Sequence, residues 1–202
     1  MRLLLPALAA LIGLSLQSAR AEISSAYTDL DPEKDCTVFS KAAEGDGDWA
    51  DLVCTGYRGY PVFIYYADAR EGLFYGFPPG GDLAPAWESF NAFNASGPRI
   101  EWRLDNETGD PVPFATIHRW FVNADPEDPE KKIEVLVVEK VGQPHAREGC
   151  VVGYVVATGN QAANDKARRI ADSRARHFAC GGGEPVVEQG TVPLPSFSRG
   201  EQ

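Results

Sequence analysis

Four cysteines constrain the fold of this 202-residue chain more than any other feature of its sequence. An even number of widely spaced cysteines in an exported chain indicates disulfide bonds. The alternatives are free thiols and zinc coordination, although zinc favours close pairs such as C-x-x-C. We expect two disulfides, for which four cysteines allow three connectivities. The four residues are Cys36, Cys54, Cys150 and Cys180.

The first two cysteines close the segment CTVFSKAAEGDGDWADLVC, whose midpoint is Gly45. An EF-hand calcium loop needs oxygen ligands at positions 1, 3 and 5, glycine at 6 and glutamate at 12, and the acids of this segment do not fit that spacing. Glycines near the midpoint tolerate the positive φ of a tight turn. The segment therefore predicts a disulfide-closed hairpin with an acidic tip at 44–51. Its expected pairs are Cys36 with Cys54, Val38 with Leu52, and Phe39 with Asp51.

The last two cysteines bracket a predicted strand at 150–158 and a predicted helix at 161–179. A strand of about eight steps spans roughly 26 Å, and a helix of about 18 residues returns roughly 27 Å. A helix packed antiparallel on the strand would therefore bring Cys180 over Cys150, within disulfide distance. This arrangement pairs Cys150 with Cys180 and leaves Cys36 to pair with Cys54.

The predicted helix has a cap residue, Asn160, before its start and three glycines, 181–183, after its end. Alanine dominates its apolar face, and small side chains let a helix lie close to a sheet. Its charges predict ion pairs within the helix, between Asp172 and both Arg168 and Arg176. The apolar face consists of Ala163, Ala167, Ile170, Ala171, Ala175 and Phe178.

Strand patterns account for most of the chain before this helix. Some segments alternate apolar with polar residues, while the aromatic segment 60–68 is apolar on both faces, as in a buried strand. Short connections favour antiparallel neighbours. The sequence predicts an α+β fold, with one antiparallel sheet of about seven or eight strands and one C-terminal helix packed on it. The clearest expected strands are 60–68, 70–77, 98–105, 114–122, 131–141 and 150–158.

The first 21 residues have the features of a secretory signal peptide. MR precedes the apolar run LLLPALAALIGLSL, and Ala19-Arg20-Ala21 fits a cleavage site; an uncleaved membrane or amphipathic helix is the alternative. We expect a signal peptide at 1–21, a single domain at 22–185 and a partly disordered tail at 186–202. The expected location is periplasmic or secreted, with no membrane span after signal cleavage.

The charge of the chain disfavours nucleic acid as a partner. Two of the 19 basic residues, Arg2 and Arg20, lie in the expected signal peptide, which leaves 17 against 29 acidic residues and a net charge of −12. Binding to phosphates needs clustered lysine and arginine on a basic surface. An acidic surface favours solubility and permits a cationic protein partner.

Sequence motifs for catalysis are scarce. G-x-S-x-G, S-x-x-K and H-E-x-x-H do not occur, and His118, His145 and His177 are not at ligand spacing on one predicted element. We therefore assign no catalytic residue, no metal ligand and no cofactor. Whether the acidic tip at 44–51 holds an ion stays open.

The segment 56–77 offers the best candidates for ligand contacts. It is rich in aromatic residues and contains two arginines near its ends. Exposed tyrosines stack on sugars, but most aromatic residues of this segment fit a hydrophobic core equally well. The possible binding residues are Tyr57, Arg58, Tyr60 and Arg70.

Two segments carry a resemblance to known sequences. On GDWADLVCTGYRGYPVFIYYADAREGLFYGF and CVVGYVVATGNQAANDKARRIADSRARHFAC, the chain is similar to a type of exported protein from Gram-negative alphaproteobacteria. The resemblance implies a periplasmic address and supplies no activity and no catalytic residue. Small periplasmic lysozyme inhibitors share the profile of an exported, disulfide-bonded, β-rich protein, but their motif residues have no match here.

These observations favour a non-enzymatic binding or interaction protein of the cell envelope, with a protein or a glycan as its unknown partner. Two alternatives stay open. One is a lysozyme-inhibitor-like protein, whose acidic surface would act on a cationic enzyme. The other is an envelope hydrolase whose site is assembled from loops far apart in the sequence.

Overall fold

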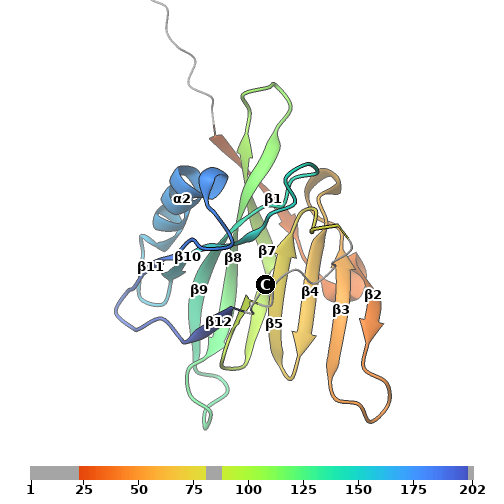
Figure 1. Ribbon diagram of the computed structural model, residues 1–202. Helices are drawn as coiled ribbons and strands as arrows, with labels where there is room; N and C mark the ends of the chain where they lie inside the picture. Colours follow the sequence, from red (N-terminus) through yellow and green to blue (C-terminus); the bar gives the residue numbers. More distant parts are fainter. Residues whose placement is uncertain (1–22, 81–87, 200–202) are drawn as a thin grey trace, which may run out of the picture.

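The computed structural model describes residues 23–80 and 88–199 (Figure 1). The expected signal peptide at 1–21 lies outside the described residues. Both expected disulfides are present, with the Cα atoms of Cys150 and Cys180 5.6 Å apart, and the second bond joins Cys36 to Cys54. Within the described residues, no helix is both long enough and apolar enough to cross a membrane.

Six strands form the larger sheet, in the order β1-β7-β8-β9-β10-β11. Neighbouring strands are antiparallel except β10 and β11, which are parallel. Successive connections explain the antiparallel pairs from β7 to β10, because consecutive strands joined by short connections pair antiparallel, whereas β1 reaches β7 from a distant part of the chain. The strands are β1 (Ile23–Asp29), β7 (Asn94–Asp105), β8 (Val112–Asn123), β9 (Lys132–Lys140), β10 (Cys150–Val156) and β11 (Val186–Glu188).

Four further strands form a second antiparallel sheet in the order β2-β3-β4-β5, and two short strands, β6 and β12, form a third. The expectation of one sheet of seven or eight strands is therefore wrong. The strands are β2 (Cys36–Lys41), β3 (Trp49–Cys54), β4 (Val62–Ala67), β5 (Arg70–Tyr75), β6 (Glu88–Phe90) and β12 (Phe197–Arg199).

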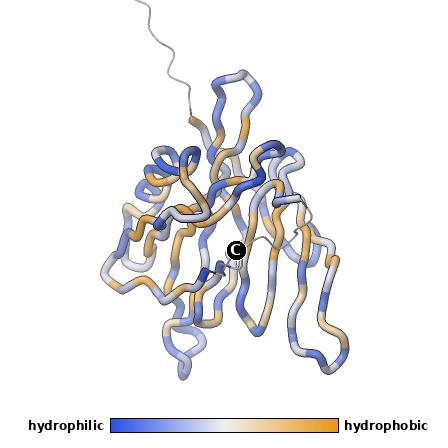
Figure 2. The backbone as a smooth tube through the Cα atoms, in the orientation of Figure 1, coloured by the Kyte–Doolittle hydropathy of each residue, from blue (hydrophilic) through white to orange (hydrophobic). Residues whose placement is uncertain are grey.

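The reason for the division is that the central strands are apolar on both faces. One face of the six-stranded sheet packs against the four-stranded sheet, with Trp102 on β7 and Tyr75 on β5 5.9 Å apart between ring centroids. The opposite face packs against the C-terminal helix. A sheet buried on both sides needs a layer on each side, and the chain supplies a helix for one and a second sheet for the other. Figure 2 shows hydrophobic stretches along the strands and hydrophilic ones at many of the loops.

The expected C-terminal helix is confirmed with shorter bounds: α2 spans Ala163–Arg174 and continues as the 3-10 turn η2 (Ala175–His177). The predicted cap residue, Asn160, is not the N-cap: Ala162 holds that position without a side-chain cap bond, and Asn160 accepts a hydrogen bond from the backbone N–H of Ala162. All six residues of the predicted apolar face are buried, as the flat contact of the helix with β8, β9 and β10 requires. Two other short helical segments are α1 (Pro32–Asp35) and η1 (Tyr57–Gly59).

The first hairpin, β2–β3, has the expected pairs of Cys36 with Cys54 and of Val38 with Leu52. Gly45 in its turn has a φ of 84°, as predicted for the midpoint. The register then shifts, so that Ser40 rather than Phe39 lies opposite Asp51. The predicted third pair is wrong because Phe39 is the extra residue of a β-bulge. Its ring contacts Phe63 edge to face, at 6.3 Å between centroids.

The C-terminal segment expected to be partly disordered, 186–202, is described up to residue 199. Within this part, β11 pairs with β10 and β12 pairs with β6.

Candidate functional site

Three of the four possible binding residues gather around η1. Tyr57 packs its ring against Trp102 at 6.2 Å between centroids. Tyr60 donates a hydrogen bond from its hydroxyl to Oε1 of Gln143, at 3.0 Å. The exposed Arg58, whose φ is 46°, holds its guanidinium 5.4 Å from the centroid of the Tyr57 ring. Both tyrosines thus contact other residues of the protein and have structural roles.

The fourth candidate, Arg70, is not brought together with the others. It begins β5, beside the turn that joins β4 to β5, and forms an ion pair with Asp68 at 3.5 Å. Tyr60 precedes the far end of β4, and a strand of six residues spans about 20 Å. The four side chains therefore do not form one site.

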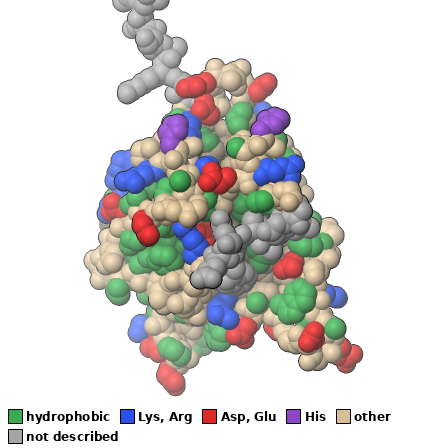
Figure 3. Space-filling model, in the orientation of Figure 1, with side chains coloured by type: hydrophobic (Ala, Val, Ile, Leu, Met, Phe, Trp, Pro, Cys, Tyr) green, Lys and Arg blue, Asp and Glu red, His purple; other side chains and the backbone are tan. Residues whose placement is uncertain are grey.

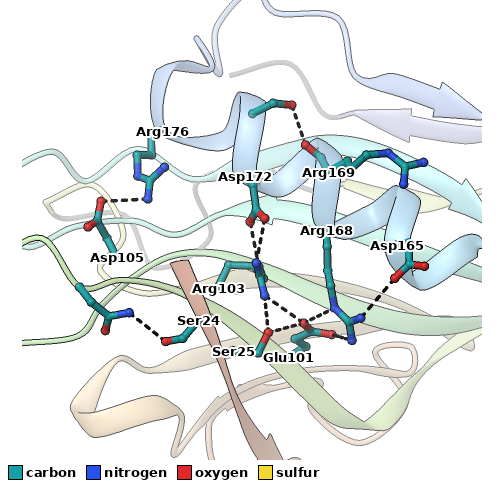
Figure 4. Close-up of polar contacts among 12 residues, drawn as sticks. Ser24, Ser25, Glu101, Arg103, Asp105, Asp165, Arg168, Arg169, Asp172 and Arg176 are labelled. Atoms are coloured by element: carbon teal, nitrogen blue, oxygen red, sulfur yellow. Dashed lines mark hydrogen bonds and ion pairs between the residues drawn. The ribbon is translucent and has the colours of Figure 1, made fainter. Parts of the chain in front are cut away.

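A polar network joins α2 to the edge of the six-stranded sheet (Figure 4). Arg103 on β7 donates two hydrogen bonds of 2.8 Å to the carboxylate of Asp172 on α2. Arg168 on α2 donates in turn to both oxygens of Glu101 on β7, at 2.8 and 3.1 Å. Ser25 on β1 donates to Glu101 at 2.6 Å. The network thus links three elements that are distant in sequence.

These contacts correct the ion pairs expected within the helix. Asp172 pairs with Arg103, and Arg176 pairs with Asp105 on β7 at 2.9 Å. The helix lies flat on the sheet, so the charged side chains at its flank reach β7 more easily than one another. The signal for this was present in the predicted strand 98–105. Its polar positions, Glu101, Arg103 and Asp105, carry charges in an alternating row on the face opposite Trp102.

The charges of the network stabilise the contact between α2 and the sheet. Burial favours the neutral form of Glu101, but hydrogen bonds from Arg168 and Ser25 outweigh it and hold the pKa of this carboxyl below its ordinary value. The same contact with Glu101 raises the pKa of Arg168. Each charge in the network has an opposite partner. The network therefore fixes the helix on the sheet and offers little free charge to a ligand.

An open pocket of about 280 Å³ lies beside this network. Tyr27, Arg99, Arg119 and Asn164 are among the residues that line it. Arg99 pairs with Asp29 on β1, and Arg119 pairs with Glu134 on β9. The charges of the pocket are again neutralised by their neighbours.

One surface with uncompensated charge among the described residues is on the β2–β3 hairpin, which projects beside the body of the molecule (Figure 1). Glu44, Asp46 and Asp48 lie in or beside its turn, and none of them forms an ion pair with a described basic residue. Asp48 accepts one hydrogen bond, from the hydroxyl of Tyr66 at 3.2 Å. The tip of the hairpin therefore carries an unneutralised cluster of carboxylates.

Large apolar side chains are exposed on the same hairpin. The exposed fractions are 49% for Val38, 40% for Phe39 and 37% for Trp49. β2 is also the edge strand of its sheet, so one side of its backbone has no strand partner among the described residues. We call these three apolar residues, together with Glu44, Asp46 and Asp48, the hairpin surface. Figure 3 shows acidic and hydrophobic side chains side by side at the corresponding lower corner of the molecule.

Sequence reasoning placed the acidic tip on a hairpin but did not single out Val38, Phe39 or Trp49. Their exposure depends on β2 lying at a sheet edge. Within the described residues, no group of three or more histidine, cysteine, aspartate or glutamate side chains is arranged to hold a metal ion.

Comparison of the chain with protein-family models, with curated proteins and with solved structures gave no match. The proposals below therefore depend on the geometry of this chain alone.

Proposed function

We propose that this protein is an exported, non-enzymatic interaction protein that binds a cationic protein through its hairpin surface. The observation that carries the proposal is the combination of an unneutralised acidic tip with exposed Val38, Phe39 and Trp49 on a projecting edge hairpin. The two disulfides support export, because such bonds persist in oxidising compartments.

Each part of the hairpin surface suits a protein partner. Aromatic side chains are enriched in the buried cores of protein interfaces. An unpaired edge strand offers backbone groups for pairing with a partner strand, a risk that most proteins suppress by shielding the edge. Carboxylates at the rim attract a basic surface and speed the encounter. The Cys36–Cys54 bond closes the base of the hairpin, so that binding does not first have to order it.

Site-specific photocrosslinking in the exporting cell tests the proposal. A photoreactive amino acid at Phe39 or Trp49 is expected to give discrete adducts, whereas the same group at Val187, an exposed position on β11, is the matched control. Equal yields at all three positions, or adducts at none, would contradict a specific surface on the hairpin.

The second readout is how far the association rate with the captured partner depends on the charge of the hairpin tip. The double substitution Asp46→Lys and Asp48→Lys is expected to slow association with that partner by about tenfold or more at low salt. The control is the double substitution Glu107→Lys and Asp110→Lys in the exposed β7–β8 loop, which makes the same change of charge elsewhere. A partner with an acidic surface, or equal effects of both reversals, would sink the electrostatic part of the proposal.

The same acidic tip favours one more specific candidate, a lysozyme-inhibitor-like activity. A cationic enzyme would dock on the tip and be blocked by the projecting hairpin. Purified protein at micromolar concentration is expected to slow a lysozyme in this case, and the Asp46→Lys, Asp48→Lys variant to lose that effect. Unchanged lysozyme rates would eliminate inhibition and leave the broader interaction proposal standing.

A further inference from the structure

The C-terminal strand β12 fills a site that is built for an arginine. Glu88 on β6 is only 6% exposed, and its carboxylate forms an ion pair with Arg199. It also accepts a hydrogen bond of 2.7 Å from the backbone N–H of Val151. Arg199 donates further to the carbonyl oxygens of Val151, at 3.1 Å, and Gly183, at 3.3 Å. The guanidinium is thus held by one buried carboxylate and two carbonyl groups.

An aromatic shelf lies two residues along the strand from this arginine. Phe197 stacks on Tyr154 of β10 at 4.3 Å between ring centroids, with an interplanar angle of 35°. Tyr154 in turn contacts Phe90 of β6 at 5.7 Å. Ser198, between Phe197 and Arg199, is exposed. The strand therefore presents an aromatic residue and an arginine to the protein, and a serine to solvent.

Backbone hydrogen bonds to β6 also hold β12 in this site. β12 pairs antiparallel with β6 over three residues, Phe197 with Phe90, Ser198 with Ser89 and Arg199 with Glu88. The backbone N–H of Asn91 also donates to the carbonyl oxygen of Ser196 at 2.9 Å. Addition of an extended segment to a short strand, with pockets for alternate side chains, is an established mode of peptide recognition.

The ionised form of Glu88 favours an occupant that carries a positive charge. A buried carboxylate without a partner is costly, and the neutral form becomes favoured instead. Burial raises the pKa of Glu88, and the hydrogen bond from Val151 and the charge of Arg199 act against this shift. A lysine would supply the charge, but the fork of the arginine side chain also satisfies the two carbonyl groups.

We propose that β6, Glu88 and Tyr154 form a binding site for an extended peptide segment of a partner protein that carries an aromatic residue two positions before an arginine. The chain's own segment 197–199 occupies this site as a tethered ligand. The proposal is independent of the hairpin surface, which lies in a different sheet.

Tethering predicts how strongly the tail competes. A segment on a short linker acts at an effective concentration of the order of millimolar. The apparent affinity for a free peptide falls in proportion to the fraction of molecules in which the site is open. An intact tail should therefore weaken peptide binding by about tenfold or more.

The test uses the full chain with the substitutions Phe197→Ala and Arg199→Ala, and a fluorescent peptide with the sequence of residues 193–199. Fluorescence anisotropy is expected to show peptide binding at least about tenfold tighter to this double variant than to the wild-type chain. The matched control is Ser198→Ala, which changes only the exposed residue of the strand and should behave as wild type. Circular dichroism and retention of both disulfides confirm that each variant is folded.

Altered peptides, measured with the same double-variant protein, distinguish sequence-specific recognition from non-specific binding. Replacement of the peptide's arginine by lysine, or of its phenylalanine by alanine, should each weaken binding by about tenfold. No peptide binding by the folded double variant, or equal binding of all three peptides, would overturn the proposal. A wild-type dimer that disappears with Arg199→Ala would assign the site to the tail of a second copy and refute a foreign partner.

Discussion

His118 on β8 should make the folded protein sensitive to mild acid. Its imidazole is fully buried between the two larger sheets. Nε2 donates to the carbonyl oxygen of Gly97 at 2.6 Å, and Nδ1 accepts from the hydroxyl of Tyr75 at 2.7 Å. This arrangement uses both nitrogens of the neutral ring. Burial lowers the pKa of His118 from 6.5 to about 4, against the opposing effect of the bond to Gly97.

The sign and the size of the effect follow from that shift. Well above pH 6.5 the ring is neutral in both states and contributes no pH dependence. Between about pH 6.5 and pH 4 the unfolded chain binds a proton that the folded protein does not, so stability falls as the pH falls. Each pKa unit corresponds to about 1.36 kcal/mol. Lowering the pKa from 6.5 to about 4 therefore reduces the free energy of unfolding in acid by about 3 kcal/mol.

Urea unfolding at pH 7 and pH 4 measures this loss, with His118→Gln as the reference. Glutamine has one donor and one acceptor group and does not titrate. Glu88 and Glu139, whose pKa values burial raises, stabilise the fold as the pH falls and therefore oppose His118. Both glutamates are present in the wild-type protein and in the His118→Gln variant. The difference between the two proteins in stability lost from pH 7 to pH 4 therefore reports on His118 alone. A difference near zero, or an imidazole NMR titration midpoint near 6.5, would refute the reasoning.

Three further predictions concern residues that stabilise the fold. Replacing Cys150 and Cys180 by serine opens a loop of 30 residues and should cost about 3.6 kcal/mol by the chain-entropy relation, measured by denaturant unfolding under oxidising conditions; a loss below 1 kcal/mol would contradict the constraint. Arg103→Met removes two hydrogen bonds to Asp172, one to Ser25 and the ion pair with the buried Glu101, and should cost about 2–3 kcal/mol, more than the same substitution of the more exposed Arg168; equal costs would disprove that ranking. Gly76→Ala should prevent stable folding, because φ is 90° and the new Cβ would lie 2.2 Å from a carbonyl oxygen; a thermal midpoint within a few degrees of wild type would contradict this.

The sequence was sufficient wherever the structure depends on lengths along the chain. The Cys36–Cys54 pair follows from the symmetry of its segment about Gly45. The Cys150–Cys180 pair follows from a strand and a helix of equal length. Rise per residue is nearly constant in each element, so counting residues predicts which ends meet. The position of the bulge at Phe39 was missed, because β2 has only 6 residues, too few for a one-residue change of phase to stand out from the alternating pattern.

The candidate surfaces could be predicted only in part. The acidic tip was visible as a run of carboxylates. The exposure of Phe39 and Trp49 was not visible, because an apolar residue on a strand looks the same in the sequence at an edge and in a core. The pairing of Glu88 with Arg199 joins residues that are 111 positions apart and has no local signal.

The sequence by itself determined the two disulfides, the buried face of α2 and the predominance of antiparallel strands, because each depends on local geometry or on periodicity. Tertiary structure alone decided that the strands divide into three sheets, that Arg103 and Arg168 pair across to other elements, and that the tail returns to β6. The physical reason is common to all three. Periodicity shows which side chains share a face, but the partner of that face is chosen by packing among segments distant in the chain.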